Sequence, residues 1–283
     1  MVPGPFFSGG VISGPTEVST TELPKVMASE RWRLALEAWA IPEVILAQAE
    51  VSPWILPPAL FQTPAAISPT PSHDRAREAL GLEASVLDVG CGGGVAAFAL
   101  LPEVQRVTGV DRQREMLAMF EANARDRGLV AETVEGLWPE VASRTRLADV
   151  VTAHHVVYNV GDVVPFLRAL DEHARFRVVT EMTTRHPLTS LNEAWMHFWG
   201  LERPSGPTSD DLVEVLDEMG LRASLERFEG TTWSESSPYE AANFARIRLC
   251  LPASRESEVR AFLQRHPAPT ARSLVTLWWD HHS

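Results

Sequence analysis

Residues 86–94 read VLDVGCGGG, and this stretch is the most informative part of the sequence for the fold. Its first residues predict a short buried strand, and the glycines that follow allow a tight turn into the N-terminus of a helix. In a sheet built this way, ligands bind beyond the carboxyl ends of the strands. The spacing is D-x-G-x-G-x-G. A dinucleotide site would need a glycine at Val95, and a phosphate loop would need a Gly-Lys-Ser/Thr ending, so neither pattern is met.

Strands and helices alternate from Ser85 onward, which predicts a doubly wound, mostly parallel α/β sheet of seven strands. The expected strands are 86–89, 107–110, 130–134, 149–153, 177–182, 221–228 and 274–280. The helices expected among them are the one opened by the glycine turn, 114–127, 162–173, 189–199, 208–219, 238–250 and 255–265. Ahead of the sheet, Ser29 is expected to cap a helix to Ala40, Pro42 to begin a second, and Ser72 to start a third that ends near Gly81.

The chain divides by composition into three parts. Residues 1–28 are rich in Gly, Pro, Ser and Thr and predict a flexible arm, which either wraps over the body or precedes the original start at Met27. Residues 29–80 predict a helical cap region. Residues 81–283 predict the sheet domain, with helical insertions at about 188–204 and 236–268.

Asp111 closes the second expected strand, where a carboxylate can accept hydrogen bonds from both hydroxyls of a ribose. Because of Asp111 and the glycine turn, residues 80–187 resemble the class I S-adenosylmethionine-dependent methyltransferases. Residues 205–229 resemble them more loosely. The resemblance implies a Rossmann-like methyltransferase fold in which the closing strand inserts antiparallel beside the fifth. It also implies S-adenosyl-L-methionine as the cofactor.

The resemblance further implies which residues hold that cofactor. The amino-acid part would lie against Gly90–Gly92, with Asp88 ordering the loop, Asp111 at the ribose, and Arg112 and Met116 near the adenine. The family's acidic residue after the third strand is replaced here by Gly136-Leu137, so a main-chain contact near Leu137 and packing by Trp138 are expected instead. The full set of expected cofactor contacts is Asp88, Gly90, Cys91, Gly92, Asp111, Arg112, Met116, Leu137, Trp138, Ala153 and His154.

Two histidines, His154 and His155, directly follow the fourth strand, and in the resembled family this segment passes the sulfonium. Methyl transfer needs an acceptor held in line, and an oxygen or nitrogen acceptor can also need a base with a pKa near the working pH. We therefore expect His154 to project over the cofactor and His155 to turn toward the following helix, with one of them the catalytic base. The alternative is that both only shape the loop.

The acceptor site is expected among aromatic and histidine side chains near the fourth and fifth strand ends and in the insertion. The candidates are Tyr158, His186, Trp195, His197 and Trp199. They favour an aromatic-walled pocket for a small molecule, although tryptophans of this kind can equally attach the helical additions to the sheet. We expect no metal, because the segment after the fourth strand lacks a converging set of carboxylates or a third positioned zinc ligand.

Composition excludes several classes. A formal net charge of −12 argues against a nucleic acid or an anionic membrane as partner, and no run of the chain is apolar enough for a membrane span. Cys91 and Cys250 are the only cysteines, so no disulfide framework is expected and the reducing cytoplasm fits best. The oligomeric state stays open.

The sequence therefore predicts an enzyme that transfers a methyl group from S-adenosylmethionine to an oxygen or nitrogen of a small molecule. Two rival interpretations remain. One is a methyltransferase that modifies carbon or an acidic protein. The other is a non-catalytic regulatory or scaffold protein that keeps the fold and the cofactor site.

Overall fold

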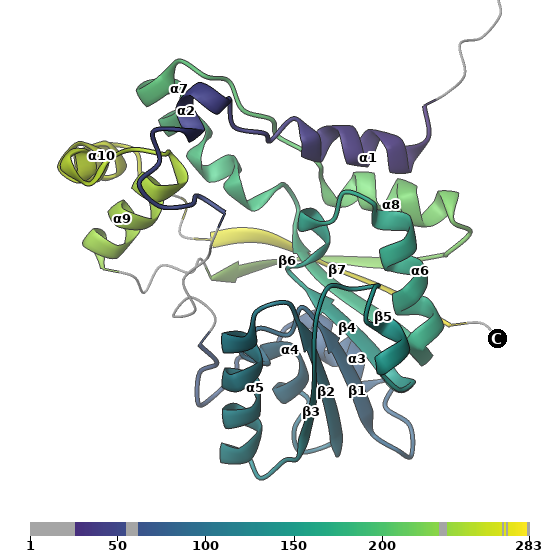
Figure 1. Cartoon of the computed structure of the whole chain (residues 1–283). Helices are drawn as coiled ribbons and strands as arrows, with labels where there is room; N and C mark the ends of the chain where they lie inside the picture. The colour runs from purple at the N-terminus through teal and green to yellow at the C-terminus, as the bar shows by residue number, and fades with distance from the viewer. Residues whose placement is uncertain (1–25, 55–61, 232–236, 268, 270, 282–283) are drawn as a thin grey trace, which may run out of the picture.

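The computed structural model describes residues 26–281, with gaps at 55–61, 232–236, 268 and 270. Its centre is a sheet of seven strands in the order β3-β2-β1-β4-β5-β7-β6 (Figure 1). The strands are β1 (Ser85–Val89), β2 (Arg106–Asp111), β3 (Ala131–Glu135), β4 (Ala148–His154), β5 (Ala174–Thr183), β6 (Ser224–Thr231) and β7 (Ala271–Asp280). Strands β1 to β5 are parallel to one another, and β7 lies antiparallel between β5 and β6. This confirms the predicted fold class and the inserted last strand.

The described helices flank the sheet or gather beyond its edge. The α-helices are α1 (Ala28–Glu37), α2 (Glu43–Leu46), α3 (Pro71–Arg77), α4 (Val95–Phe98), α5 (Arg114–Asp126), α6 (Val163–His173), α7 (Asn192–Trp199), α8 (Ser209–Glu218), α9 (Pro238–Arg248) and α10 (Glu256–Arg265). Short 3₁₀ turns η2 (Ala142–Arg144), η3 (Val157–Asn159), η4 (Pro187–Leu191) and η5 (Ala253–Arg255) complete the set.

Each face of the sheet has its own apolar core because successive strand side chains point to opposite faces. On one face, α1, α6 and α8 cover residues such as Leu87 and Val151. On the other, α3, α4 and α5 cover Val86 and Val150. Trp279 joins the first core and Trp278 packs against the second, as their adjacent positions in β7 require.

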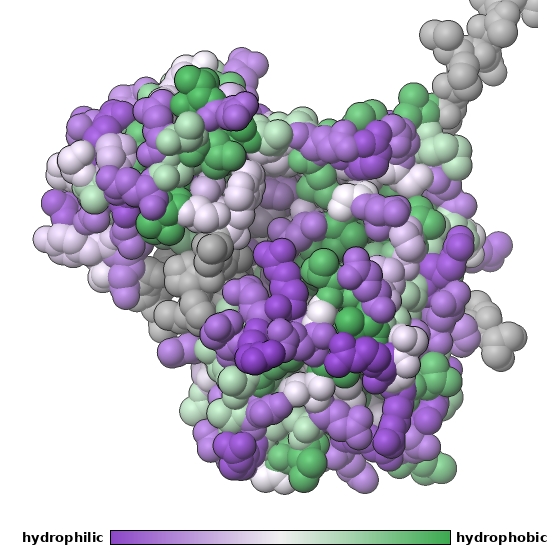
Figure 2. Space-filling model, in the orientation of Figure 1, coloured by the Kyte–Doolittle hydropathy of each residue, from purple (hydrophilic) through white to green (hydrophobic). Residues whose placement is uncertain are grey.

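A third apolar cluster lies in the helical additions. It joins α2 to α7, α9 and α10, which gather at one side of the molecule (Figure 1). Residues 29–80 therefore do not pack as one unit: α1 belongs to the sheet core through Trp32, and α3 to the opposite core through Ala76. On the face shown in Figure 2, hydrophilic side chains predominate and apolar ones form separate patches.

Three predicted helix starts were wrong. Met27, not Ser29, is at the N-cap of α1, which ends at Glu37, and the Ser29 hydroxyl instead donates to Glu218 of α8 at 2.7 Å. Pro42 is the N-cap of α2 rather than its first residue. Thr70 precedes α3, which ends at Arg77. The Ser72 hydroxyl lies 2.7 Å from Glu181 Oε2. Most of the proposed N-terminal arm, residues 1–25, lies outside the described residues.

Candidate functional site

The glycine turn lies at the carboxyl end of β1, between β2 and β4. Gly90, Gly92 and Gly94 have φ angles of +70°, +50° and +94°, in the left-handed region that favours glycine. The Gly90 amide donates to the Val110 carbonyl at 2.7 Å, which ties the turn to β2. A Cβ on Gly90 would collide with the Val156 side chain, so the loop after β4 packs directly on this turn.

Asp111 ends β2 beside the turn, as predicted. Its Oδ2 accepts from the Gly92 amide at 3.2 Å, and its Oδ1 accepts from the Gln113 amide at 2.9 Å. Each carboxylate oxygen has two lone pairs, so the half-buried carboxylate can accept further hydrogen bonds.

Asp88 lies in β1 beneath the glycine turn and is almost fully buried. Its Oδ1 accepts from the Thr152 hydroxyl at 2.9 Å. Burial raises the pKa of Asp88 to about 7, and the hydrogen bond from Thr152 only partly opposes that rise. The residue therefore cross-links β1 to β4 beneath the turn.

His154 is the last residue of β4 and lies against α3. Its ring stacks on that of His73 with centroids 5.8 Å apart. Its Nε2 is buried and has no hydrogen-bond partner among the described residues. Burial lowers the pKa of His154 to about 3, which leaves the imidazole uncharged at neutral pH.

His155 turns toward β5, not into a helix as expected. Its Nε2 lies 3.2 Å from Glu181 Oε1, and its amide donates to the Glu181 carbonyl at 2.7 Å. Its φ of +59° is in the left-handed region, which costs a non-glycine residue on the order of 1 kcal/mol. The neighbouring contacts that hold this conformation also fix the direction of the ring.

Glu181 is a buried carboxylate near the end of β5 with three side-chain partners. Besides His155, it accepts from the hydroxyls of Thr70 at 2.9 Å and Ser72 at 2.7 Å. Burial acts to raise its pKa, but the hydrogen bond from His155 and the nearby imidazoles outweigh burial and hold the pKa of Glu181 well below its usual range. The carboxylate is thus a charged centre that organises α3, β4 and β5.

Tyr158 and His186 lie on the far side of His155. The Tyr158 ring is 6.5 Å from the His155 ring and 5.7 Å from the His186 ring, centroid to centroid. His186 stacks on Trp39 at 4.2 Å, and burial lowers its pKa to about 4. Burial also raises the pKa of Tyr158 well above its usual range. A chain of aromatic contacts thus runs from the end of β4 to the helical additions.

The remaining cofactor candidates occupy different surroundings. Cys91, Met116 and Ala153 are buried near the turn, whereas Arg112 and Leu137 are exposed. Trp138 is buried in the sheet core, where its Nε1 donates to the Phe166 carbonyl at 3.3 Å and its ring meets His173 edge-on.

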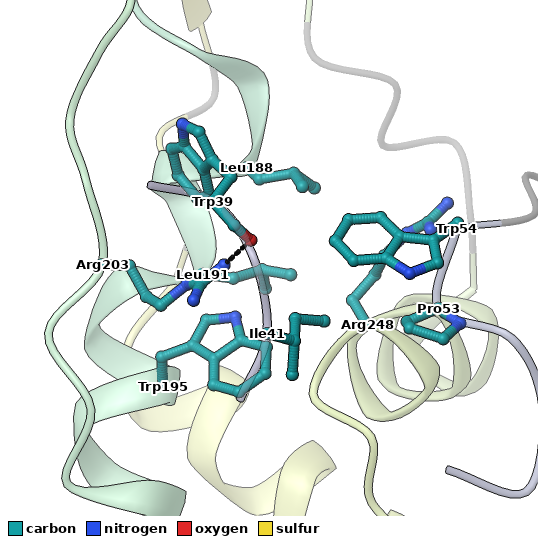
Figure 3. Close-up of a pocket in the computed structure, with 9 residues that line it drawn as sticks. All are labelled: Trp39, Ile41, Pro53, Trp54, Leu188, Leu191, Trp195, Arg203 and Arg248. Atoms are coloured by element: carbon teal, nitrogen blue, oxygen red, sulfur yellow. Dashed lines mark hydrogen bonds between the residues drawn. The ribbon is translucent and has the colours of Figure 1, made fainter. Parts of the chain in front are cut away.

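Two of the acceptor candidates make no described contact with the residues at the carboxyl ends of β1, β4 and β5. His197 is exposed and stacks on Phe262 of α10. Trp199 donates from Nε1 to the Leu249 carbonyl at 2.7 Å, within the cluster of helical additions. Trp195 is buried in that cluster but lines a groove there (Figure 3).

Sequence reasoning missed Glu181, His73 and Thr70. Glu181 carried a usable signal, because a carboxylate stands alone in the otherwise uncharged strand sequence VVTEMT. His73 and Thr70 carried none, since their role depends on how α3 packs against β4 and β5.

Among the described residues, no cluster of three or more His, Cys, Asp or Glu side chains has a geometry suited to a metal ion. Within the same part of the chain, no helix is both long and apolar enough to cross a bilayer.

Comparison with known proteins identifies the domain. Residues 86–176 match a family described as a methyltransferase domain. A ubiquinone biosynthesis O-methyltransferase of Aeromonas salmonicida is 31% identical over 109 residues, which cover 38% of this chain and 46% of that protein. An uncharacterized methyltransferase of Bacillus subtilis, YcgJ, is 29% identical over 139 residues, covering 47% and 53% of the two chains. The matches span about half the length of these relatives.

Solved structures share the fold at low identity. A candidate methyltransferase of Bacillus halodurans superposes with a TM-score of 0.51 at 16% identity, over 75% of this chain and 99% of that one. The YcgJ structure gives 0.50 at 16% identity, over 75% and 98%. Residues 86–176 therefore match a methyltransferase domain, and the strand order around them agrees with the fold shared with these solved structures.

Proposed function

We propose that the chain binds S-adenosylmethionine at the carboxyl ends of β1, β2 and β4 and transfers its methyl group to an oxygen or nitrogen of a small molecule. The proposal rests on the position of two features, the glycine turn with Asp111 and the loop after β4, at the same edge of the sheet. Val156 packs on the glycine turn beside Asp111, and it directly follows the two histidines, His154 and His155, in the loop after β4.

The residues of this edge fit the cofactor. Left-handed φ angles at Gly90, Gly92 and Gly94 let the main chain turn sharply at the carboxyl end of β1, where a sheet of this kind binds its ligands. The Asp111 carboxylate retains acceptor capacity for two ribose hydroxyls. When bound, S-adenosylmethionine supplies a methyl group on a positively charged sulfur. This chain has to hold an acceptor atom in line with that methyl group and remove a proton where the acceptor carries one.

We propose different roles for His154 and His155. His154 is uncharged at neutral pH, so its Nε2 can accept or donate one hydrogen bond that orients the acceptor, but a pKa near 3 makes it a weak proton acceptor. His155 is the better candidate for proton removal, because the Glu181 carboxylate lies 3.2 Å from its Nε2 and orients its ring. Glu181 is then a positioning residue.

The acceptor is proposed to be a small molecule. Three observations support this: a relative is named as an O-methyltransferase, this chain has a net charge of −12, and aromatic contacts run from Tyr158 to Trp39. A cytoplasmic location and the absence of a nucleic-acid partner are parts of the same proposal. A non-catalytic scaffold is not favoured.

The test is a product assay with methyl-labelled S-adenosylmethionine and a panel of aromatic acids, phenols and amines. Loss of a positioned base usually lowers turnover about 100-fold or more. We expect His155→Ala to do so with unchanged cofactor affinity. Glu181→Gln keeps the shape of the side chain but removes its charge, and should shift the pH profile of kcat.

His266→Ala is the matched control, since His266 is an exposed histidine at the end of α10, and it should leave turnover unchanged. Cofactor binding without transfer to any member of a broad panel would contradict the catalytic proposal. Turnover that survives His155→Ala would contradict only the role given to that base.

A further inference from the structure

Two buried hydroxyl groups connect β7 to the Glu181 carboxylate. Ser72, in the first turn of α3, is fully buried and donates from its hydroxyl to Glu181 Oε2 at 2.7 Å. The Thr276 hydroxyl of β7, also fully buried, lies 2.6 Å from the Ser72 hydroxyl. Thr276 is directly opposite Glu181 in the ladder between β5 and β7, so both side chains point to the face of the sheet that α3 covers.

The chemistry of these groups fixes the direction of each hydrogen bond. The pKa of Glu181 is held well below its usual range, so its carboxylate is ionised and can only accept. Ser72 has one hydroxyl proton, and that proton goes to Glu181. The Thr276 hydroxyl therefore donates to the Ser72 oxygen, and the donors run in one direction, from β7 through α3 to β5.

The two oxygens of the Glu181 carboxylate have different partners. Oε2 accepts from the hydroxyls of Thr70 and Ser72, both at the start of α3, at 2.9 Å and 2.7 Å. Oε1 lies 3.2 Å from His155 Nε2. Two donors on Oε2 restrain rotation of the carboxylate about its last bond, so Oε1 stays directed at the imidazole.

The same arrangement determines which ring nitrogen of His155 carries a proton. Nε2 faces an oxygen that can only accept, so Nε2 bears a hydrogen and donates it. A neutral imidazole has a single N–H, which leaves the lone pair on Nδ1. A base takes up a proton through its lone pair, so this tautomer decides which edge of the ring can act on an acceptor.

We infer that Ser72 and Thr276 are positioning residues for methyl transfer: through the Glu181 carboxylate they hold His155 as the Nε2–H tautomer, with Nδ1 as its basic nitrogen. The inference rests on the proposed function, because it concerns the base of that site. Both hydroxyls act through Glu181, so neither has to touch the acceptor or the cofactor. They also belong to α3 and β7, and not to the strand ends proposed to bind the cofactor.

The test records the nitrogen NMR signals of the histidine rings at about pH 8, where an ordinary histidine is neutral. These signals distinguish the two neutral tautomers and the imidazolium, and His155→Ala identifies the His155 signals by their loss. We expect the Nε2–H tautomer in the wild-type protein and a measurable share of the Nδ1–H tautomer in Ser72→Ala.

The same variants are assayed with an acceptor found by the labelled-methyl assay. Ser72→Ala should lower kcat about tenfold, the size of one hydrogen bond to a charged group, with an unchanged KM for S-adenosylmethionine. Thr276→Val keeps the shape of the side chain and removes only its hydroxyl. It should change the tautomer and kcat in the same direction but less, because it acts one hydrogen bond further from Glu181.

Ser85→Ala is the matched control. Ser85 is a buried serine whose hydroxyl accepts from the Asp149 amide at 2.9 Å, at the end of β1 opposite the glycine turn. This variant also loses a hydrogen bond between two elements, but it should keep the His155 tautomer and kcat. Denaturant titration checks that each variant is folded.

The two claims fail separately, because the tautomer is measured without an acceptor. A wild-type His155 that is the Nδ1–H tautomer or carries both protons would overturn the positioning role. So would a folded Ser72→Ala variant that leaves either the tautomer or kcat unchanged. If the tautomer responds to Ser72→Ala and not to Ser85→Ala, but no acceptor is methylated, the proposed function fails while the assignment of the His155 tautomer stands.

Discussion

Gly90 shows how a single residue joins the turn after β1 to the loop after β4. Its φ of +70° disfavours any side chain, and the space where a Cβ would stand is filled by Val156. Because Val156 follows the two histidines, a shift of its side chain moves the segment that we assign to the acceptor.

We expect Gly90→Ala to lower the free energy of unfolding by about 2–4 kcal/mol, from the left-handed conformation and the overpacking together. It should also weaken S-adenosylmethionine binding. Gly128→Ala is the matched control: Gly128 has a φ of +73° but nothing within 4 Å of the added Cβ, so only the conformational cost of about 1–2 kcal/mol remains. Denaturant titration and calorimetry measure both effects, and equal losses in the two variants would contradict the packing claim.

At the scale of elements, the N-cap residue of a helix was predictable only where its side chain makes no hydrogen bond to a distant element. Thr208 caps α8 as predicted, because it and Asp211 satisfy each other's amides within one turn. Ser29 and Ser72 have the same hydroxyl, yet the structure uses them for Glu218 and Glu181 on distant elements. Local spacing cannot reveal such long-range partners, which is why these helix starts were misplaced by one or two residues.

The short element η4 depends on an uncharged histidine. His186 Nδ1 accepts from the Leu188 amide at 3.3 Å, an interaction that protonation would remove. Its pKa is about 4 when folded, against about 6.5 for the ordinary value, so between these values the unfolded chain binds more protons. Stability should therefore rise with pH across this window and be lost as the pH falls.

We expect His186 to contribute a loss of about 2 kcal/mol when the pH falls from 8 to 5. His186→Asn keeps a capping acceptor without a titrating group, so its stability should change less over the same range. Chemical denaturation of both proteins at the two pH values measures the difference. An identical pH dependence in the variant would show that His186 is not buried in the uncharged form.

For the whole molecule, the alternation of strands and helices was enough to predict the sheet, and the resemblance to the class I methyltransferases predicted the antiparallel β7. The glycine turn and Asp111 were found because strand ends in such a fold meet at one edge. Glu181 was missed although its lone carboxylate was a usable signal, because two of its hydrogen-bond donors, Thr70 and Ser72, lie more than 100 residues away in the chain. The packing of α3 on β5, and of Trp39 on residues 203–206, is a tertiary outcome that no local pattern encodes.

Calorimetric titration of the whole chain with S-adenosylmethionine and its demethylated product tests the proposed cofactor site directly. We expect micromolar binding by the wild-type protein, at least about tenfold weaker binding by Asp111→Asn, and unchanged binding by Asp126→Asn, at the other end of α5. No binding by the wild type, or equal binding by the Asp111 variant, would contradict the placement of the cofactor at this edge of the sheet.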